Sequence, residues 1–355
     1  MNALEQQLHY PFGDEVPAVG TTREVAPGVR WLRMQLPFVL DHINLWLLRD
    51  RLDGTEGWTI VDCGISSGPT RAAWERIFAH ELDGLPVLRV VVTHMHPDHM
   101  GLAHWLTERW SGDGRDCRLW ISATDYGAAR LASSATTGFG GDATARFMAR
   151  HGLSDPDAQA QIRARKNYYA GMVPAVPSTY RRMTGGDTLT IGGRAWHCHA
   201  GYGHAPEHIA LHCPESGLLV SGDMVLPRIS TNVSVYDVEP ESNPLALFLA
   251  SLARLRALPE DTLVLPSHGK PFVGLQTRID QLEAHHRERL ADVMKACSVA
   301  PQTAHALLPV LFQRALDLHQ TTFAMGEAVA HLHALWHAGR LTRRLDDDGA
   351  YRFSA

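Results

Sequence analysis

The chain has 355 residues, of which 45% are hydrophobic and 20% are charged, as is typical of a globular protein with a sizeable core. The formal net charge of −5 disfavours a nucleic-acid partner, because surfaces that bind nucleic acid are usually basic. Five cysteines without a CxxC pair do not form the pattern of a disulfide framework, which favours a reducing, cytoplasmic location. We expect neither a signal peptide nor a transmembrane helix, since no stretch reaches 18 apolar residues.

The first third of the chain is expected to consist of strands and one helix. Apolar runs rich in β-branched or aromatic residues predict strands at 29–34, 44–48, 58–61, 87–92 and 119–121. Residues 69–80 predict a helix, because Trp74, Ile77 and Phe78 recur at helical spacing on one face. Gly54 and Gly57 indicate a hairpin before the helix.

The middle of the chain contains a segment without any strand pattern. Alanine, arginine and methionine dominate residues 123–183, and we expect two or three helices inserted between strands, over about residues 125–183. Strands resume near Thr188, with apolar runs at 195–200, 209–212, 218–220 and 262–265. A helix is predicted over 243–258, with Asn243 as its cap and Pro244 in its first turn.

The remainder, from Gly274, is predicted to be mainly helical. Helical segments are expected at 277–296, 302–312 and 325–338, followed by a hairpin over 341–353. Three helices and a hairpin in this order are typical of a winged helix. We therefore expect two domains, residues 1–275 and residues 276–355.

The most informative sequence feature is a dense cluster of residue types that bind metals. His94, His96, Asp98 and His99 lie within six residues, directly after the apolar strand expected at 87–92. Burying so many polar groups without partners would be costly, so they are expected at a site. The carboxyl end of a buried strand is where α/β-type sites form. Imidazole and carboxylate together suit zinc, and also iron or manganese.

Three further ligand-type residues follow at the ends of later strands. They are His204 in the sequence GHAPEH, Asp223 in SGD and His268 in SHG. Each stands beside small residues that allow the backbone to approach closely. His208 is interpreted as a structural or orienting residue. The remaining histidines, including those of the predicted C-terminal helices, are expected away from the metals.

The motifs HxHxDH, GH, SGD and SHG, in this order, resemble those of the metallo-β-lactamase superfamily over about residues 25–275. Asp62 matches the first motif of that family and would orient ligands. The resemblance implies an α/β (α+β) fold, an αββα sandwich that here carries the helical insertion and a C-terminal winged-helix-like domain. One departure is Tyr202, where the family often has proline. We expect it to alter the loop or pocket wall and not metal binding.

The resemblance also implies two metal ions, zinc in the first place, each held by three residues and bridged by a seventh. The ligands are His94, His96 and His204 for one ion, Asp98, His99 and His268 for the other, and Asp223 between them. A water bridging two cations becomes a hydroxide near neutral pH and attacks a carbonyl or a phosphorus. Asp98 and Asp223 are the candidate catalytic residues for moving protons.

Several substrates remain open at this stage. We favour a small-molecule carboxylic ester, thioester or lactone. A phosphodiesterase or single-strand endoribonuclease is the alternative, and an iron-dependent redox enzyme is a third. Within the insertion, Arg163, Arg165 and Lys166 accompany a set of apolar side chains, and this mixture suits an acyl chain with an anionic end. The apolar set is Phe139, Phe147, Met148, Tyr168, Tyr169 and Met172.

The C-terminal segment resembles the winged-helix extension of a β-lactamase-like subfamily that includes mitochondrial endoribonucleases and polyketide thioesterases. Residues 276–355 contain nine Arg or Lys and nine Asp or Glu, so the segment has no net charge. The expected wing turn contains Asp346, Asp347 and Asp348, which would repel phosphates. We therefore expect a packing or homodimerisation role for this segment and no nucleic-acid partner.

Overall fold

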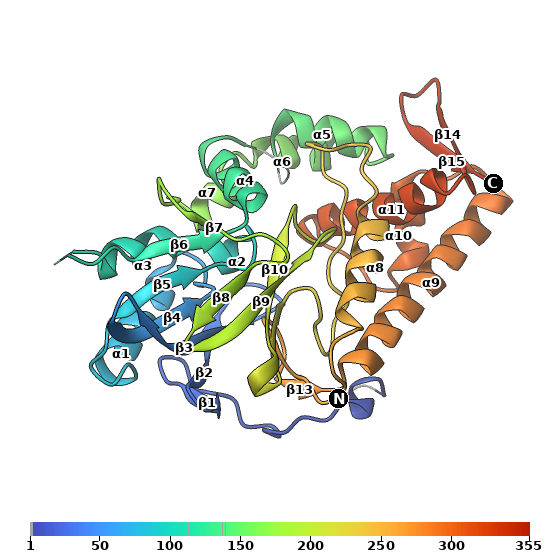
Figure 1. The fold of residues 1–355 in the computed structure, drawn as a ribbon. Coiled ribbons are helices and arrows are strands. Elements are labelled where there is room, and N and C mark those ends of the chain that lie inside the picture. The colour runs from blue at the N-terminus through green and yellow to red at the C-terminus, as the bar shows by residue number, and fades with distance from the viewer. Residues whose placement is uncertain (1–2, 113, 137, 139) are drawn as a thin grey trace.

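The computed structural model describes residues 3–112, 114–136, 138 and 140–355. Its first sheet contains seven strands in chain order (Figure 1). Neighbours from β1 to β4 are antiparallel and those from β4 to β7 are parallel, so β1 to β4 connect by turns and the later strands by helices. The strands are β1 (Arg23–Ala26), β2 (Val29–Gln35), β3 (His42–Leu52), β4 (Thr55–Val61), β5 (Val87–Val91), β6 (Arg118–Ile121) and β7 (Arg181–Arg182).

The second sheet contains six strands in the order β13-β12-β11-β10-β9-β8. Only the β11–β12 pair is parallel, and α8 (Pro244–Leu255) provides the crossover between these two strands. The Asn243 side chain caps α8 by accepting from the Ala246 amide at 3.4 Å, as expected. The strands are β8 (Thr188–Ile191), β9 (Arg194–Gly201), β10 (His208–Cys213), β11 (Leu218–Gly222), β12 (Leu263–Pro266) and β13 (Phe272–Val273).

The two sheets pack face to face with helices on both outer faces, which is the expected αββα sandwich. Trp46 and Val61 of the first sheet share a buried cluster with Leu211 of the second. The outer face of the first sheet is covered by α1 (Gly68–His80), α3 (Ala103–Trp110) and α4 (Ala123–Ser134). The outer face of the second sheet is covered by α8 and the C-terminal helices (Figure 1).

The middle segment forms four helices, where two or three were expected, and it ends in the short strand β7, which was not predicted. The helices are α4, α5 (Gly141–Arg150), α6 (Pro156–Ala164) and α7 (Tyr168–Met172). The side chains of α4 and α7 belong to the core of the first sheet, whereas those of α5 and α6 join the core of the C-terminal helices. The insertion therefore spans from the sandwich to the C-terminal segment.

The C-terminal segment has the expected order of three helices and a hairpin. It contains α9 (Leu275–Val299), α10 (Ala304–Leu311), α11 (Leu318–His337), β14 (Thr342–Leu345) and β15 (Tyr351–Ser354). Leu307 and Val329 lie in the same buried cluster as Leu219 and Phe248 of the sandwich. The core of this segment is thus continuous with that of the second sheet.

Strand β1 and helix α3 are among the elements of the first third that were not predicted from the sequence. Strand β1 has a single buried residue, Val25, so it lacks the alternation that marks a strand. Helix α3 begins four residues after His99 and spans only eight residues. Among the described residues, no helix combines the length and apolar character needed to cross a membrane.

Candidate metal centre

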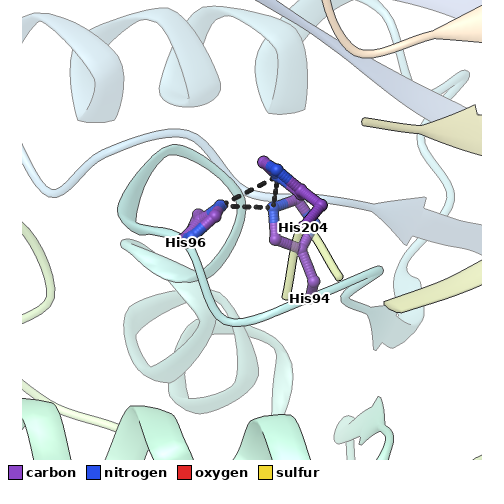
Figure 2. Close-up of side chains that lie close together, drawn as sticks. All are labelled: His94, His96 and His204. Carbon is purple, nitrogen blue, oxygen red and sulfur yellow. Dashed lines mark hydrogen bonds between the residues drawn. The ribbon is translucent and has the colours of Figure 1, made fainter. Parts of the chain in front are cut away.

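Three histidines from two loops meet at the edge of the sandwich. His94 and His96 follow β5, and His204 lies in the loop between β9 and β10. His94 Nε2 lies 2.9 Å from His96 Nδ1, and His204 Nε2 lies 3.0 Å from His96 Nδ1 and 3.2 Å from His94 Nε2 (Figure 2). Three imidazole nitrogens thus converge around one point, in the manner of a cation site.

A second group forms beside the first. Asp98 and His99 belong to the short helix α2 (Pro97–Met100), and His268 follows β12. Asp98 Oδ2 lies 3.6 Å from His99 Nε2 and 3.4 Å from His268 Nε2. This mixed group of two imidazoles and a carboxylate is a second cluster with metal-ligand chemistry.

Asp223, directly after β11, lies between the two groups. Its Oδ2 is 3.3 Å from His204 Nε2 in the first group. Its Oδ1 is 3.5 Å from both His99 Nε2 and His268 Nε2 in the second group. One carboxylate therefore presents an oxygen to each group.

The outer nitrogens of the histidines are held by acceptors. His99 Nδ1 lies 2.8 Å from Asp62 Oδ2, and His204 Nδ1 lies 2.7 Å from the Asn232 carbonyl oxygen. His268 Nδ1 lies 2.7 Å from the His42 carbonyl oxygen. Because Nδ1 of these three histidines faces an acceptor, their favoured tautomer leaves Nε2 free to bind a cation, whereas His96 presents Nδ1 to the cluster.

Asp62 has the orienting position that the resemblance implied. It follows β4 with a φ of 62°, in the left-handed region that a non-glycine residue seldom adopts. Its Oδ1 accepts the Thr93 amide at 2.8 Å, and its Oδ2 faces His99. The unusual backbone thus aims one carboxylate at both the loop and a member of the cluster.

The two groups differ in charge. Burial, reinforced by neighbouring imidazoles, lowers the pKa of His94 and lowers that of His96 to about 3. Burial opposes protonation of His99 and His268 as well, yet the nearby carboxylates raise the pKa of both, that of His268 to about 10. His94 and His96 are therefore neutral imidazoles, and negative charge gathers around the second group.

Two buried atoms show that this donor set fits cations. Among the described residues, His99 Nε2 and Asp223 Oδ1 are buried and have no hydrogen-bond partner. Buried polar atoms are rarely left unsatisfied, and both point into the cluster. Cations bound there would satisfy them, with the residues of the two triads and Asp223 as ligands.

His208 and Tyr202 have structural contacts. The Asp223 amide donates to His208 Nε2 at 3.2 Å, so His208 supports the backbone of the central carboxylate. The Tyr202 amide donates to Ser251 Oγ of α8 at 3.0 Å, a bond that proline could not make. Tyr202 does not line the cavity described below, so its effect is on the packing of the loop against α8.

A cavity of about 590 Å³ opens over the cluster. Its floor includes His96, Asp98, His204, Asp223 and His268. His319 of α11 joins the walls, since its ring centroid lies 6.2 Å from that of Phe38 and 5.7 Å from that of Tyr168. The apolar side chains of the walls are Leu36, Phe38, Val39, Leu40, Met172, Phe312, Leu316 and Phe323.

The walls differ from the expected arrangement. Of the insertion residues considered for a pocket, only Tyr168 and Met172 line the cavity, and Phe139 lies outside the described residues. Phe147 and Met148 are core residues, and Arg165 donates to Thr322 of α11 at 3.2 Å. The larger wall comes from residues 312–327, so the C-terminal segment contributes to the site as well as packing on the sandwich.

Several residues around the cluster carried no signal in the sequence. His42 and Asn232 contribute through their backbone carbonyls, which any residue type could provide. Asp125 accepts backbone amides from both histidine-bearing loops, a long-range contact that no motif marked. His199 and His212 have ring centroids 5.8 Å apart, on a strand pair away from the cluster, as expected.

An αββα sandwich with a His/Asp cluster at one edge is the architecture of a metal-dependent hydrolase. A family model described as the metallo-beta-lactamase superfamily matches residues 39–268, and a model of the metallo-beta-lactamase-like C-terminal domain matches residues 290–355. The chain belongs to the metallo-β-lactamase superfamily.

Relatives and solved structures agree with this assignment. The structure is similar to that of a beta-lactamase domain protein from Burkholderia ambifaria, with 58% identity, 99% of both chains covered and a TM-score of 0.94. It is also similar to a metallo-beta-lactamase family protein from Thermus thermophilus, with 26% identity, a TM-score of 0.72 and coverage of 93% of this chain and 99% of that one.

Two curated relatives carry names that indicate hydrolysis. A probable metallo-hydrolase from Bacillus subtilis is 25% identical over 323 residues, which are 86% of this chain and 91% of that protein. A linear primary-alkylsulfatase from Pseudomonas is 26% identical over 255 residues, which are 68% of this chain and 44% of that protein.

Proposed function

We propose that the protein is a binuclear metal-dependent hydrolase, most readily loaded with zinc, that cleaves a carboxylic ester, thioester or lactone. The observation that carries this proposal is the position of Asp223, with one oxygen toward each triad at the floor of a largely apolar cavity. His94, His96 and His204 would hold one ion. Asp98, His99 and His268 would hold the other.

Asp98 and the apolar cavity walls have different roles in the proposed reaction. When bound, two cations would supply an acidified water and a Lewis acid for the substrate carbonyl. The Asp98 side chain is 18% exposed and faces the cavity, so it can accept a proton and return it to the leaving group. The apolar walls orient the acyl chain and exclude water around the reacting carbonyl.

Arg314 supplies a recognition element for an anionic group. It is the one Arg or Lys among the described residues that line the cavity, and its Nη1 lies 3.2 Å from Gln320 Oε1. We expect Arg314→Gln to raise KM about tenfold for an acyl ester that ends in a carboxylate, as for one lost charge-assisted hydrogen bond. Its matched control is Arg163→Gln, since Arg163 does not line the cavity.

A second candidate is hydrolysis of an alkyl sulfate ester, favoured by the similarity to the alkylsulfatase. In that case the sulfate would lie at the metals and the alkyl chain along the walls, so Arg314 would matter little. Phosphodiester or single-stranded RNA cleavage is disfavoured because that single guanidinium cannot follow a polyanion along several phosphates.

The test compares turnover of aryl esters, acyl thioesters, lactones, alkyl sulfates and single-stranded RNA at low and moderate salt. We expect carboxylic substrates to be cleaved best, with activity lost on chelation and restored by zinc. Efficient cleavage of RNA or alkyl sulfate with esters barely touched would reverse the ranking. One tightly bound iron per chain would instead favour redox chemistry.

A further inference from the structure

Two buried side chains of the helical insertion reach the loop that carries the first histidines. Asp125 Oδ1 of α4 accepts the Met95 amide at 2.8 Å. The Tyr169 hydroxyl of α7 donates to the Met95 carbonyl oxygen. Met95 lies between His94 and His96, so both polar atoms of the residue separating these histidines are held by the insertion.

The same carboxylate also reaches the second loop of the first triad. Asp125 Oδ2 accepts the Glu207 amide at 2.6 Å, three residues after His204. Asp125 is fully buried, and Tyr169 is 3% exposed. One side chain therefore ties together the two separate loops that provide the three histidines.

The hydrogen bonds at residue 125 require a carboxylate side chain. Its oxygens accept two amides from different loops, whereas an asparagine would turn an N–H toward one of them. Among the described residues it forms no ion pair, so the amides and the N-terminal turn of α4 compensate its charge. Ser122, the cap of α4, accepts the Asp125 amide at 3.2 Å, and its hydroxyl donates to Asp125 Oδ2 at 3.3 Å.

We propose that Asp125 and Tyr169 are positioning residues that set the spacing of His94, His96 and His204. The helical insertion thereby controls the affinity of one metal of the pair. This proposal rests on the proposed function only in that the first triad must bind a metal. In addition to its small contribution to the cavity wall, the insertion would position the histidines of the first triad.

The experiment measures metal binding with the full-length protein and needs no substrate. Zinc is titrated against a chelator to give one affinity for each ion, and cobalt absorption reports on the geometry of its ligands. We expect Asp125→Asn and Tyr169→Phe to weaken one of the two affinities about 10–100-fold, as outer residues that orient ligands do. The other affinity should stay within a factor of about three.

The matched control is Tyr126→Phe in the same insertion. The Tyr126 hydroxyl donates to the Pro177 and Ser178 carbonyl oxygens at 2.9 Å, away from the histidine loops. The Tyr126→Phe variant lacks the same phenolic oxygen as Tyr169→Phe, but this oxygen does not contact the histidine loops. The metal affinities of Tyr126→Phe should therefore equal those of the wild type. Tyr169→Phe keeps the test decisive even if Asp125→Asn does not fold.

The outcomes separate this proposal from the proposed function. Unchanged affinities in the folded variants would overturn the positioning role, as would an equal loss at both ions or a loss that Tyr126→Phe shares. A wild-type protein that binds no metal at the first triad would defeat the proposed function instead. Site-selective weakening with an unchanged melting temperature of the metal-free protein supports the proposal.

Discussion

At the scale of single residues, Asp223 is the side chain whose loss should affect both metal sites. Since each of its oxygens faces one triad, we predict that Asp223→Ala lowers kcat/KM by more than about a hundredfold and reduces metal content at both sites. His208→Ala removes only an acceptor for the Asp223 amide and should cost about tenfold. Activity and elemental analysis of both variants check this, and equal losses would contradict it.

Glu327 provides a residue-scale prediction about pH. Burial raises the pKa of this cavity-lining carboxyl group from 4.5 to about 7, and Arg289 only partly offsets the effect. Between pH 4.5 and 7 the unfolded chain releases this proton while the folded chain retains it. The contribution of Glu327 to the free energy of unfolding therefore falls as pH rises.

The measurement is urea unfolding of the wild type and Glu327→Gln across pH 4.5–8. Since glutamine does not titrate, the free energy of unfolding of the wild type minus that of the variant should decrease through this window. Metal effects common to both proteins cancel in the difference. A difference that is flat, or that increases with pH, would contradict the raised pKa of this partly buried carboxyl group.

The metal-binding side chains of the candidate site could be predicted from the sequence. The groups that hydrogen-bond to them and hold their loops could not. Histidine and aspartate at strand ends carry a pattern because metal chemistry demands those residue types. The carbonyls of His42 and Asn232 hold histidines through atoms that every residue possesses. Asp125 accepts a hydrogen bond from the Glu207 amide, 82 residues later in the sequence, and only the fold brings the two residues together.

At the scale of elements, a buried ion pair connects the two sheets. Asp50 of β3 accepts from Arg89 of β5 at 2.7 Å, and each of the two residues is 2% exposed. Arg89 also donates to the Thr190 carbonyl of β8, and the Gly192 amide donates to Asp50 at 2.9 Å. The pair therefore joins strands of the first sheet to the edge strand of the second.

Removing one partner leaves a buried charge uncompensated. We predict that Asp50→Ala lowers the free energy of unfolding by about 3–5 kcal/mol, measured by guanidinium unfolding. The double variant Asp50→Leu, Arg89→Met should lose less, because it buries no unpaired charge. If the double variant were the less stable of the two, the hydrogen bonds to β8 would outweigh the charge effect.

Most of the longer helices were predictable at this scale, but the short helices α2 and α3 were not, and neither was the side of each helix that faces the core. The apolar residues of the insertion looked alike in the sequence, yet Phe147 is core and Met172 lines the cavity. The C-terminal segment was expected to have a packing or homodimerisation role, yet its residues 312–327 form the larger cavity wall. The periodicity within one helix marks its apolar face, but it does not reveal what that face packs against, because this depends on tertiary packing.

At the scale of the whole molecule, the expected division at residue 275 stays a prediction, and the core provides its test. Leu307, Val329 and Leu335 of the C-terminal segment are buried together with Leu219 and Phe248 of the sandwich. Cutting the chain after Gly274 would expose the outer face of the second sheet to water. Apolar burial contributes about 25 cal/mol per Å², so even a modest area exceeds the usual margin of stability.

We therefore predict that residues 1–274 alone do not unfold cooperatively and bind fewer than two metals. The matched control shortens only the exposed turn at residues 346–349, which leaves the shared core intact and should retain wild-type unfolding. Calorimetry and metal analysis of the two proteins distinguish the cases. If the truncated chain melted cooperatively with both metals bound, the C-terminal segment would be an independent domain that only borders the site. If residues 1–274 failed to fold, the metal centre and the wall of its cavity would both depend on the core that the second sheet shares with the C-terminal helices.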